Sequence, residues 1–372
     1  MDVSIIECSS YEQDEVDNAV GKALAGIGFD IPKGKRILIK PNVLGQHLPE
    51  DNVTTHPSVV GALVRMFIKD NEVIIGESSG FYHEGGTNKA LEMSGMKVLA
   101  ERHKASLVNL EQKPVKNMED KKAAVYKNPH ISSAVFDADM VVNVPKLKTH
   151  TLMMYTGAVK NLFGTIPGGR KQKLHVLAKT PEQFANILVD IYQNIKPQLN
   201  VMDAVVGLEG NGPGSAGTSK KTGLLLASRS APCLDIVASG IIGYDPLKVY
   251  TNRACFERGL IDDINVVGRK PRVPYKKPVN VSRVPAFISR WFVNQAVMHP
   301  YAIKEKCVKC GICKGVCPVE AIKLNPYPEI DSKKCINCYC CHENCPHDAM
   351  DLKGSDIYNM LKGIKELIFG RR

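Results

Sequence analysis

The sequence predicts a large α/β domain with a mostly parallel sheet, followed by a small cysteine-rich α+β domain. Two observations lead to this prediction. Short apolar runs alternate with helical patterns over residues 1–267, and nine of the twelve cysteines lie between Cys307 and Cys345. The length of 372 residues also favours more than one domain.

Strands and helices follow from the spacing of apolar residues. We expect strands at Val3–Cys8, Arg36–Lys40, Val73–Gly76, Met140–Val144 and Leu224–Ala227. We expect helices at Asp14–Ile27, Pro57–Ile68, Thr87–Ser94 and Pro181–Ile195. Alternation of the two kinds of element favours parallel strands joined by helices, although it leaves the strand order open.

The segment 268–300 separates the two expected domains. Gly268–Arg283 is rich in basic residues and proline and has no acid, which predicts an extended, solvated linker. Val284–Met298 is typical of an amphipathic helix that docks the two domains, with a membrane surface or a partner as alternatives. Residues 301–372 form the small domain, which we expect to end in a helix.

The overall composition indicates a cytoplasmic protein of a reducing compartment. The first residues show no basic region followed by an apolar run, so no signal peptide is expected. No long uncharged apolar stretch predicts a membrane span. The net charge of +11 is compatible with solubility alone, and where the basic residues are clustered it suggests an anionic partner. Nucleic acid is not expected, because aromatic residues are only 6% and no binding motif is present.

The cysteines form one motif twice, with spacing Cys-x2-Cys-x2-Cys-x3-Cys-Pro. Three thiolates at intervals of three residues can surround one face of a [4Fe–4S] cubane, and the fourth ligates the other cluster. We therefore expect two clusters. The ligands are Cys307, Cys310, Cys313 and Cys345 for the first, and Cys335, Cys338, Cys341 and Cys317 for the second. Structural zinc is the alternative, but zinc sites generally use two separated pairs of ligands.

These motifs resemble the bacterial two-cluster ferredoxins over about fifty residues. The repeats Pro318–Ile322 and Pro346–Met350 strengthen the resemblance. It implies low-potential transfer of single electrons, and oxygen sensitivity and an anaerobic host are reasonable expectations. Cys340 is an additional thiol, either without a role or exchangeable with Cys341 as a ligand. Cys8, Cys233 and Cys255 are expected to be buried apolar residues.

A second candidate site lies in the large domain. Residues 140–180 contain no Asp or Glu but many basic residues, and the basic run Lys146–His150 directly follows an expected strand. Ligands of α/β sheets bind beyond the carboxyl ends of strands, so these side chains are expected at a crevice. We predict an anionic substrate or cofactor surrounded by Lys40, Asn42, Lys146, Lys148, His150, Lys160, Asn161 and His175. The alternative is a solvated basic loop.

Weaker candidates remain open in the same domain. His150 and His175 could bind a metal, but their spacing is not diagnostic. Glu77, Asp203 and Glu209 lie at expected strand ends. They could act as a general acid or base, or they could be turn and capping residues. The loop Asn211–Gly217 could cover a ligand, but it matches neither a phosphate-binding loop nor a dinucleotide fingerprint.

Several motifs of the large domain resemble the domain-of-unknown-function family 362. They are Lys40–Asn42, Thr55–Pro57, Gly76–Ser78, Asp139–His150, Gly157–Gly164, Met202–Val205 and Gly243–Pro246. The resemblance covers most of residues 1–265 and implies a frequent fusion to ferredoxin modules, but no settled reaction.

Two functions are compatible with these features. In the first, the clusters exchange single electrons with an anionic molecule bound by the α/β domain, as in a ferredoxin-linked oxidoreductase. In the second, the chain is an electron-carrier or adaptor subunit that docks on a partner oxidoreductase and does no chemistry of its own. Either function needs a redox partner protein or a small electron donor or acceptor.

Overall fold

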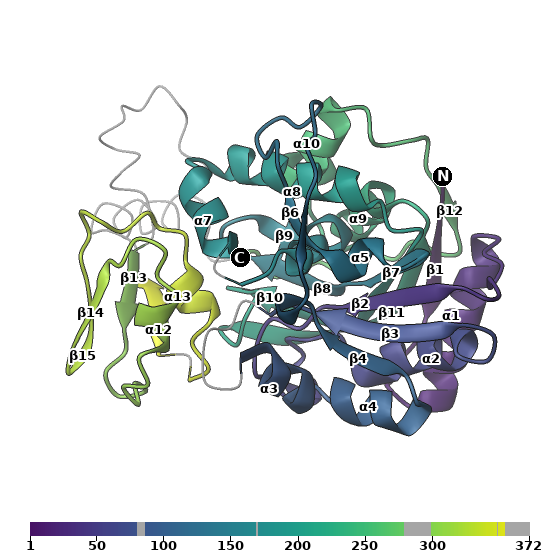
Figure 1. Cartoon of the computed structure of the whole chain (residues 1–372), viewed down its shortest axis with the longest axis horizontal. Coiled ribbons are helices and arrows are strands. Elements are labelled where there is room, and N and C mark those ends of the chain that lie inside the picture. Colours follow the sequence, from purple (N-terminus) through teal and green to yellow (C-terminus); the bar gives the residue numbers. More distant parts are fainter. Residues whose placement is uncertain (80–85, 169, 279–298, 348, 354–372) are drawn as a thin grey trace.

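The computed structural model describes residues 1–79, 86–168, 170–278, 299–347 and 349–353. In Figure 1, a large α/β domain lies beside a smaller domain that begins at β13 (His299–Ala302). The expected docking helix Val284–Met298 lies outside the described residues, as does nearly all of the expected C-terminal helix. No helix in the described ranges is long and apolar enough to cross a membrane.

A ten-stranded sheet forms the centre of the large domain. Its strands are β1 (Asp2–Glu7), β2 (Arg36–Pro41), β3 (Glu72–Glu77), β4 (Ser106–Asn109), β7 (Met140–Val144), β8 (Lys146–His150), β9 (Met154–Thr156), β10 (Leu199–Gly210), β11 (Gly217–Ser228) and β12 (Asn265–Val267). The order is β12-β1-β11-β10-β7-β2-β3-β4, with β8 beside β10 and β9 beside β8. Separately, β5 (Val115–Asn117) pairs with β6 (His130–Ser132).

Most neighbouring strands of this sheet are parallel, which confirms the predicted fold class of the large domain. The run from β10 through β7, β2 and β3 to β4 is parallel throughout. β11 is the main exception, because it is antiparallel to both β1 and β10. β10 and β11 are long neighbours joined by a short loop, which allows an antiparallel pairing without a crossover helix.

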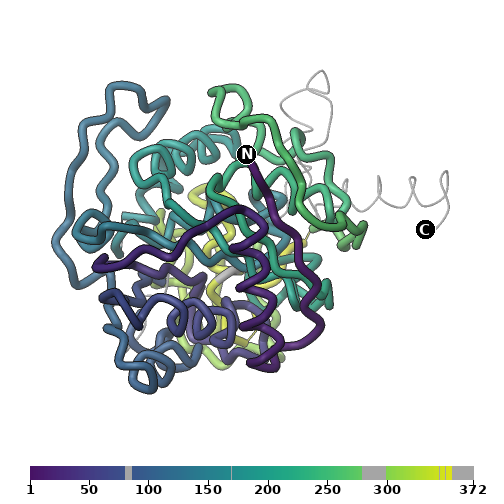
Figure 2. The backbone as a smooth tube through the Cα atoms, turned by 90° about the vertical axis from the view of Figure 1, so that its right-hand side faces the viewer, coloured from purple at the N-terminus to yellow at the C-terminus, as the bar shows by residue number. Residues whose placement is uncertain are grey.

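Helices cover both faces of the sheet. One layer contains α1 (Gln13–Gly26), α2 (Pro57–Phe67), α3 (Gly86–Met93) and α4 (Met96–His103). The other contains α5 (Ser133–Phe136), α6 (Ala158–Asn161), α7 (Arg170–Leu177), α8 (Pro181–Ile195), α9 (Ala231–Ile241) and α10 (Tyr250–Glu257). Figure 2 shows the same division from the side, with the purple and blue helices below and the teal and green ones above.

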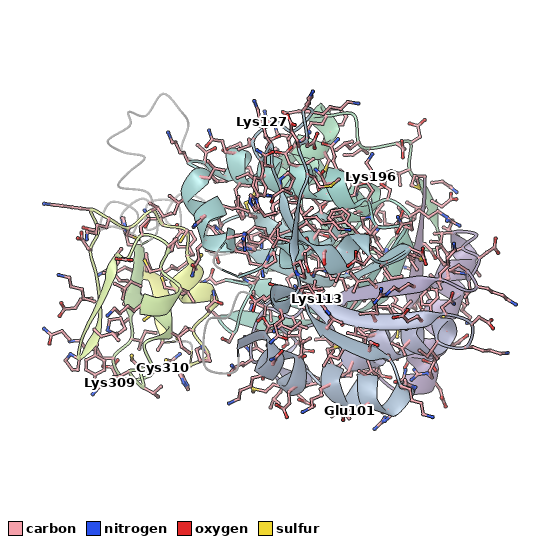
Figure 3. The ribbon with its side chains drawn as sticks, viewed as in Figure 1. Glu101, Lys113, Lys127, Lys196, Lys309 and Cys310 are labelled. Carbon is pink, nitrogen blue, oxygen red and sulfur yellow. The ribbon has the colours of Figure 1, made fainter. Side chains whose placement is uncertain are left out.

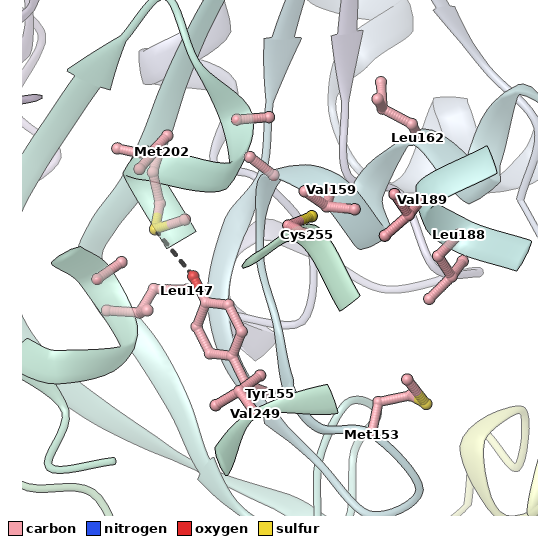
Figure 4. Packing of buried hydrophobic residues seen from close by; sticks show 14 of the residues in the cluster. Leu147, Met153, Tyr155, Val159, Leu162, Leu188, Val189, Met202, Val249 and Cys255 are labelled. Atoms are coloured by element: carbon pink, nitrogen blue, oxygen red, sulfur yellow. Dashed lines mark hydrogen bonds between the residues drawn. The ribbon is translucent and has the colours of Figure 1, made fainter. Parts of the chain in front are cut away.

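The alternation of side chains along each strand gives the domain two cores. Ile37 and Ile39 of β2 face the core formed with α1, α2 and α4, whereas Leu38 faces the core formed with α8 and α9. Figure 4 shows part of the second core, where the Tyr155 hydroxyl lies 3.9 Å from the Met202 sulfur. Strands buried on both faces explain why apolar runs predicted them well.

Local sequence also sets helix ends. The predicted helix Pro181–Ile195 is confirmed, and it begins there because the Thr180 hydroxyl accepts a hydrogen bond from the Gln183 N–H at 3.2 Å. Pro181 occupies the first helical position, where an N–H has no intrahelical partner. α2 begins similarly, with His56 Nδ1 accepting from the Ser58 N–H.

Two segments differ from the predictions. Lys146–His150 is a buried strand and not a crevice loop, because Lys146 and Lys148 find oxygen partners inside the protein. Residues 268–278 are extended as predicted, but they pack on the large domain and are not fully solvated. The Val273 and Tyr275 N–H groups donate to carbonyls at the end of α9, and the Tyr275 side chain is buried.

The small domain contains helices and antiparallel pairs. β13 pairs with β16 (Met350–Lys353), and β14 (Ile322–Asn325) pairs with β15 (Tyr327–Ile330). Two short helices lie within the matching cysteine runs, α12 (Ile312–Gly315) around Cys313 and α13 (Cys340–Glu343) around Cys341. The four remaining short helices are 3-10 turns in the large domain, η1 (Pro49–Asp51), η2 (Leu110–Gln112), η3 (Leu162–Thr165) and η4 (Pro246–Lys248).

The loop between β10 and β11 holds the small domain against the large one. The Ser215 hydroxyl donates to the Cys345 carbonyl at 3.1 Å, and His342 Nε2 lies 3.4 Å from the Asn211 carbonyl. Leu152 of the large domain packs on Tyr339. The loop predicted to cover a ligand therefore contacts the cysteine-rich domain.

Candidate functional site

The eight expected cluster ligands line two separate cavities. Cys307, Cys310, Cys313 and Cys345 line one, and Cys317, Cys335, Cys338 and Cys341 line the other. Each cavity contains about 310 Å³ of space outside protein atoms, part of it open solvent. Each set combines three cysteines of one motif with the fourth cysteine of the other, as the sequence predicted. The ligand roles themselves stay a prediction.

Matching backbone turns place the cysteines around each cavity. Lys309 and Asn337 precede the second cysteine of their motifs and have φ values of 60° and 50°. Gly311 and Tyr339 follow that cysteine with φ values of 80° and 61°. Left-handed backbone on both sides of one cysteine reverses the chain twice, so the thiols of a motif face the same space. Such strain in non-glycine residues is typical of functional sites.

The repeated segments after the fourth cysteines also have a physical role. The Ala321 N–H donates to the Cys317 sulfur at 3.2 Å, and the Ala349 N–H donates to the Cys345 sulfur at 3.2 Å. Hydrogen bonds to sulfur tune the potential of iron–sulfur clusters.

The donor set fits a cubane cluster. Each iron of a cubane binds one protein thiolate, so four sulfurs should surround a space instead of converging on one point. The two four-cysteine cavities have this form. Burial raises the pKa of the Cys313 thiol to about 11, so bound metal would be needed to hold it as a thiolate.

The remaining cysteines lie elsewhere. Cys8, Cys233 and Cys255 are buried in the large domain, as expected. Cys340 is also buried, and it lines a third cavity, not the one around Cys341.

This third cavity, which we call the interface cavity, lies between the two domains. It encloses about 720 Å³, part of it open solvent. The large domain contributes Asn42, Val43, Leu44, Glu77, Ser78, Thr156, Lys160, Asn161, Phe163, Gly164, Lys171, Gln172 and His175. The small domain contributes Val316, Cys340 and Asn344, each of which directly precedes an expected cluster ligand.

Only part of the predicted anion site lines the interface cavity. Asn42, Lys160, Asn161 and His175 do so, from three separate parts of the sequence. Lys40, Lys146, Lys148 and His150 are fully buried or nearly so and are not among its lining residues. The cavity thus combines β-strand ends with α6 and α7, which no sequence spacing could indicate.

Lys40 lies beneath the cavity in an ion pair with Glu77. Lys40 Nζ is 2.8 Å from Glu77 Oε2, and the Val43 and Ser78 N–H groups also donate to this carboxylate. Burial lowers the pKa of Lys40 and raises that of Glu77, while their mutual attraction opposes both shifts. A Cβ at Gly164 would lie 2.0 Å from Glu77 Oε1, so glycine is required at this close approach.

Lys146 belongs to a second buried network. Lys146 Nζ lies 2.9 Å from Asp203 Oδ2 and 2.7 Å from the Tyr11 hydroxyl. The Tyr11 hydroxyl donates to Asp203 Oδ1, and its ring stacks on His56. Glu77 and Asp203 therefore neutralise lysines within the fold. Lys148 Nζ instead donates to Asn42 Oδ1 at 2.6 Å and to the Val53 carbonyl.

Neither predicted histidine carries charge near neutral pH. Burial lowers the pKa of His175 to about 3, and nearby Lys160 adds to the shift. Burial also lowers the pKa of His150 well below its usual value, and His150 Nδ1 accepts N–H groups of Leu152 and Met153. Among the described residues no group of three His, Cys, Asp or Glu side chains is arranged for a single metal ion.

Lys171 is a cavity residue that the sequence prediction did not include. Its Nζ donates to the carbonyl and hydroxyl of Ser78 and to the Ser79 carbonyl at 3.3 Å. Burial lowers its pKa to about 8, so it stays mostly protonated near pH 7. The acid-free segment contained it, but helical periodicity alone could not show that it points inward.

A buried aspartate fixes the segment that carries Lys160 and Asn161. Asp235 of α9 accepts the Ala158 and Val159 N–H groups at 2.7 and 2.9 Å. A Cβ at Gly157 would lie 2.1 Å from Asp235 Oδ1, so this turn also requires glycine. Burial raises the pKa of Asp235 to about 6 despite these hydrogen bonds. The Gly157–Gly164 motif thus holds α6 between two buried carboxylates.

Comparisons with known proteins agree with this division. Residues 37–240 match the family model "Domain of unknown function (DUF362)", and residues 300–323 match the model "4Fe-4S binding domain". The thylakoid-associated protein sll1697 of Synechocystis sp. is 31% identical over 263 residues, which cover 69% of this chain and 79% of that protein.

Among solved structures, this chain is similar to the lactate racemase apoprotein from Thermoanaerobacterium thermosaccharolyticum. The TM-score is 0.38 at 12% identity, and the match covers 54% of this chain and 49% of that chain. The chain thus spans about half the length of that structure. The family match extends over more than half of the sequence: this protein belongs to the DUF362 family and carries a C-terminal 4Fe-4S binding domain.

Proposed function

We propose that this protein is a ferredoxin-linked oxidoreductase that exchanges single electrons with a small anionic molecule in the interface cavity. One observation supports this most directly. The cavity is lined by cationic residues of the α/β domain and by residues next to the expected cluster ligands. A ligand there would contact both domains, including residues that are adjacent in sequence to expected cluster ligands.

The proposal includes two [4Fe–4S] clusters, held by the two cysteine sets that line separate cavities. When bound, the clusters supply one-electron chemistry. Backbone N–H groups donate to the Cys317 and Cys345 sulfurs, and the chain buries Cys313, Cys341 and Cys345 away from water.

Lys160 and Lys171 would bind the anion, with Asn42, Asn161 and neutral His175 completing the wall of the cavity. Lys40, Lys146, Lys148 and His150 would support these residues from behind. Lys171 suits this role because its Nζ donates to three neutral oxygens, the Ser78 carbonyl and hydroxyl and the Ser79 carbonyl. Its positive charge is therefore available to an anion.

Electrons would arrive at the outer face of the small domain. Figure 3 shows Lys309 and Cys310 together at the lower end of this domain. Cys310 is the exposed member of the expected ligands, and Lys304 and Lys309 lie over the Tyr327 ring. A basic rim around an exposed ligand fits an acidic redox partner protein.

This outer face also favours a second function. An electron-carrier or adaptor subunit would use the same face for docking and would do no chemistry in the interface cavity. The two functions share the electron-transfer domain, and a cytoplasmic location is part of either proposal.

Anaerobic purification followed by iron, sulfide and EPR measurements tests the cofactor proposal. About eight iron and eight sulfide per chain are expected from two cubanes. Zinc without sulfide would contradict it.

Reoxidation separates enzyme from adaptor. The dithionite-reduced protein is mixed with a panel of small organic anions, and cluster absorbance is followed. An enzyme should be reoxidised by particular anions, and Lys171→Met should slow this step. Stable co-purification with a partner and no anion-dependent reoxidation would favour the adaptor.

A further inference from the structure

Three buried asparagines form a hydrogen-bonded row from the sheet to the interface cavity. Asn143 Nδ2 donates to Asn200 Oδ1 at 2.9 Å, which links β7 to β10. Asn161 Nδ2 donates to Asn143 Oδ1 at 2.8 Å, which links α6 to β7. Asn161 is the last member of the row and lines the cavity.

The direction of this row is fixed by backbone carbonyls. Asn200 Nδ2 donates to the Ser228 carbonyl, and Asn143 Nδ2 donates to the Ala158 carbonyl at 2.9 Å. Carbonyls only accept, so these two amide groups cannot be reversed, and Asn161 must present its Nδ2 to Asn143. Asn161 Oδ1 is consequently an acceptor. It is buried, and no described residue donates a hydrogen bond to it.

The small domain presents a second acceptor of the same kind. Asn344 Nδ2 donates to the Cys340 carbonyl at 2.8 Å, which fixes the orientation of this amide as well. Asn344 lines the interface cavity, and its Oδ1 is buried and receives no hydrogen bond from the described part of the chain. Both asparagines belong to the wall that also contains Lys160 and Lys171.

We infer that the ligand of the interface cavity is a small anion that also carries an O–H or N–H donor, with Asn161 and Asn344 as its acceptors and Lys160 and Lys171 as its cationic partners. This inference rests on the proposed function, because it concerns the same cavity. A buried acceptor without a donor is unfavourable, and a carboxylate or phosphate alone would add acceptors and no donor. A hydroxylated or N–H-bearing anion can donate to the asparagine acceptors and accept from the lysines. It would also bridge the two domains.

Matched probes that differ by one hydroxyl test this inference. The anaerobically purified full chain is titrated with 2-hydroxybutyrate and butyrate, and separately with glycerol 3-phosphate and propyl phosphate. Binding is measured by calorimetry. We expect the hydroxylated member of at least one pair to bind about tenfold more tightly or better, because sites built to hydrogen-bond a hydroxyl reject analogues that lack it. The pair that binds distinguishes a carboxylate from a phosphate ligand.

Variants assign the preference to the two acceptors. Asn344→Ala and Asn161→Ala should each reduce the hydroxyl preference at least threefold, whereas Lys171→Met should weaken both members of a pair alike. Asn186→Ala is the matched control. Asn186 Nδ2 donates to the Glu182 carbonyl four residues earlier, as Asn344 does to Cys340, but it is not a lining residue of the cavity.

Equal binding of both members to the wild type, or no binding of either pair, would overturn the inference. So would a preference that survives in both asparagine variants. Asn344→Ala keeps the test decisive even if Asn161→Ala fails to fold. Cluster content and reoxidation are measured on the same preparation. Normal clusters with anion-dependent reoxidation but no hydroxyl preference would reject this inference alone, whereas absent reoxidation would reject the proposed function.

Discussion

The two domains differ in which of their functional side chains are buried and in how far apart in sequence these residues lie. In the α/β domain, Lys40 and Lys146 are completely buried and meet carboxylates from distant parts of the sequence. In the small domain, Lys304 and Lys309 are exposed, while most of the sulfur donors are partly or fully buried. One domain assembles its site through tertiary structure, and the other through motifs that are contiguous in sequence.

This difference explains how each domain could fail. Removing one partner of a buried ion pair leaves a charge in a medium that solvates it poorly. Removing an exposed lysine leaves no buried charge without a partner. It should therefore change only the rates at which other molecules bind or react at that surface. Under the proposed function, removing one expected cluster ligand should remove a cluster. The predictions below test these contrasts in turn.

The largest expected effect comes from a cluster ligand. Cys341→Ser should lower iron and sulfide from about eight to about four per chain, because one cubane loses a thiolate. EPR of the reduced variant should lose the signals of two interacting clusters. Cys340→Ser is the matched control, one residue away and also buried, and should retain all the iron. Loss of a cluster in Cys340→Ser would instead show that Cys340 can replace Cys341 as a ligand.

The buried ion pairs come next. Lys146→Met should destabilise the protein by about 3–5 kcal/mol, because Asp203 would remain buried without its cation. Lys309→Met, the same substitution at an exposed position, should change stability by less than about 0.5 kcal/mol. Urea unfolding followed by circular dichroism under anaerobic conditions measures both. Similar effects for the two variants would show that burial does not distinguish the lysines of the two domains.

Lys171 adds a pH dependence to the α/β domain. Its folded pKa of about 8 lies below the unfolded value, so the unfolded chain binds more protons between about pH 8 and 10.5. Stability should therefore rise with pH in this window, by up to about 3 kcal/mol from this group. Glu77 and Glu111 oppose the pKa shift, and Lys40 and Lys160 increase it.

The difference between wild type and Lys171→Met isolates this contribution, since other lysines titrate in both proteins. Below about pH 8 the cost of burying the charged amine is fully present, so the variant should be relatively more stable there. The advantage of the variant should shrink as pH rises from 8 to 9.5. A stability difference that stays constant with pH would mean that Lys171 is not perturbed.

Sequence predicted best what is local. The strand Met140–Val144 and the helix Pro181–Ile195 were predicted with their observed bounds, because apolar spacing and a capping threonine define them. The two expected cysteine sets each line one cavity, and their roles as cluster ligands stay a prediction. The outer half of β11 was missed because Thr218–Lys221 is polar and lacks a strand-like apolar run.

The interface cavity could only partly be predicted. The acid-free segment pointed to Lys160, Asn161 and His175, but the partners that decide the charge of each lysine lie far away in sequence. Asp203 is 57 residues from Lys146, and Glu77 is 37 residues from Lys40. No local pattern indicates which lysine will be neutralised. The same holds for the asparagine row, which joins two strands and a helix.

The smallest expected effect concerns the exposed lysines of the small domain. The double substitution Lys304→Glu and Lys309→Glu should slow cluster reduction by the anionic dithionite radical several-fold at low salt and accelerate reduction by the cationic methyl viologen radical, because charge near an exposed ligand steers small charged reductants. Stopped-flow absorbance measures both rates. Lys127→Glu combined with Lys196→Glu changes the net charge equally but lies on the α/β domain (Figure 3). That control should leave both rates nearly unchanged at 0.15 M salt, where screening acts over about 8 Å. Equal effects of the two pairs would mean that net charge, and not the face around Cys310, governs electron arrival, and the proposed docking face would be wrong.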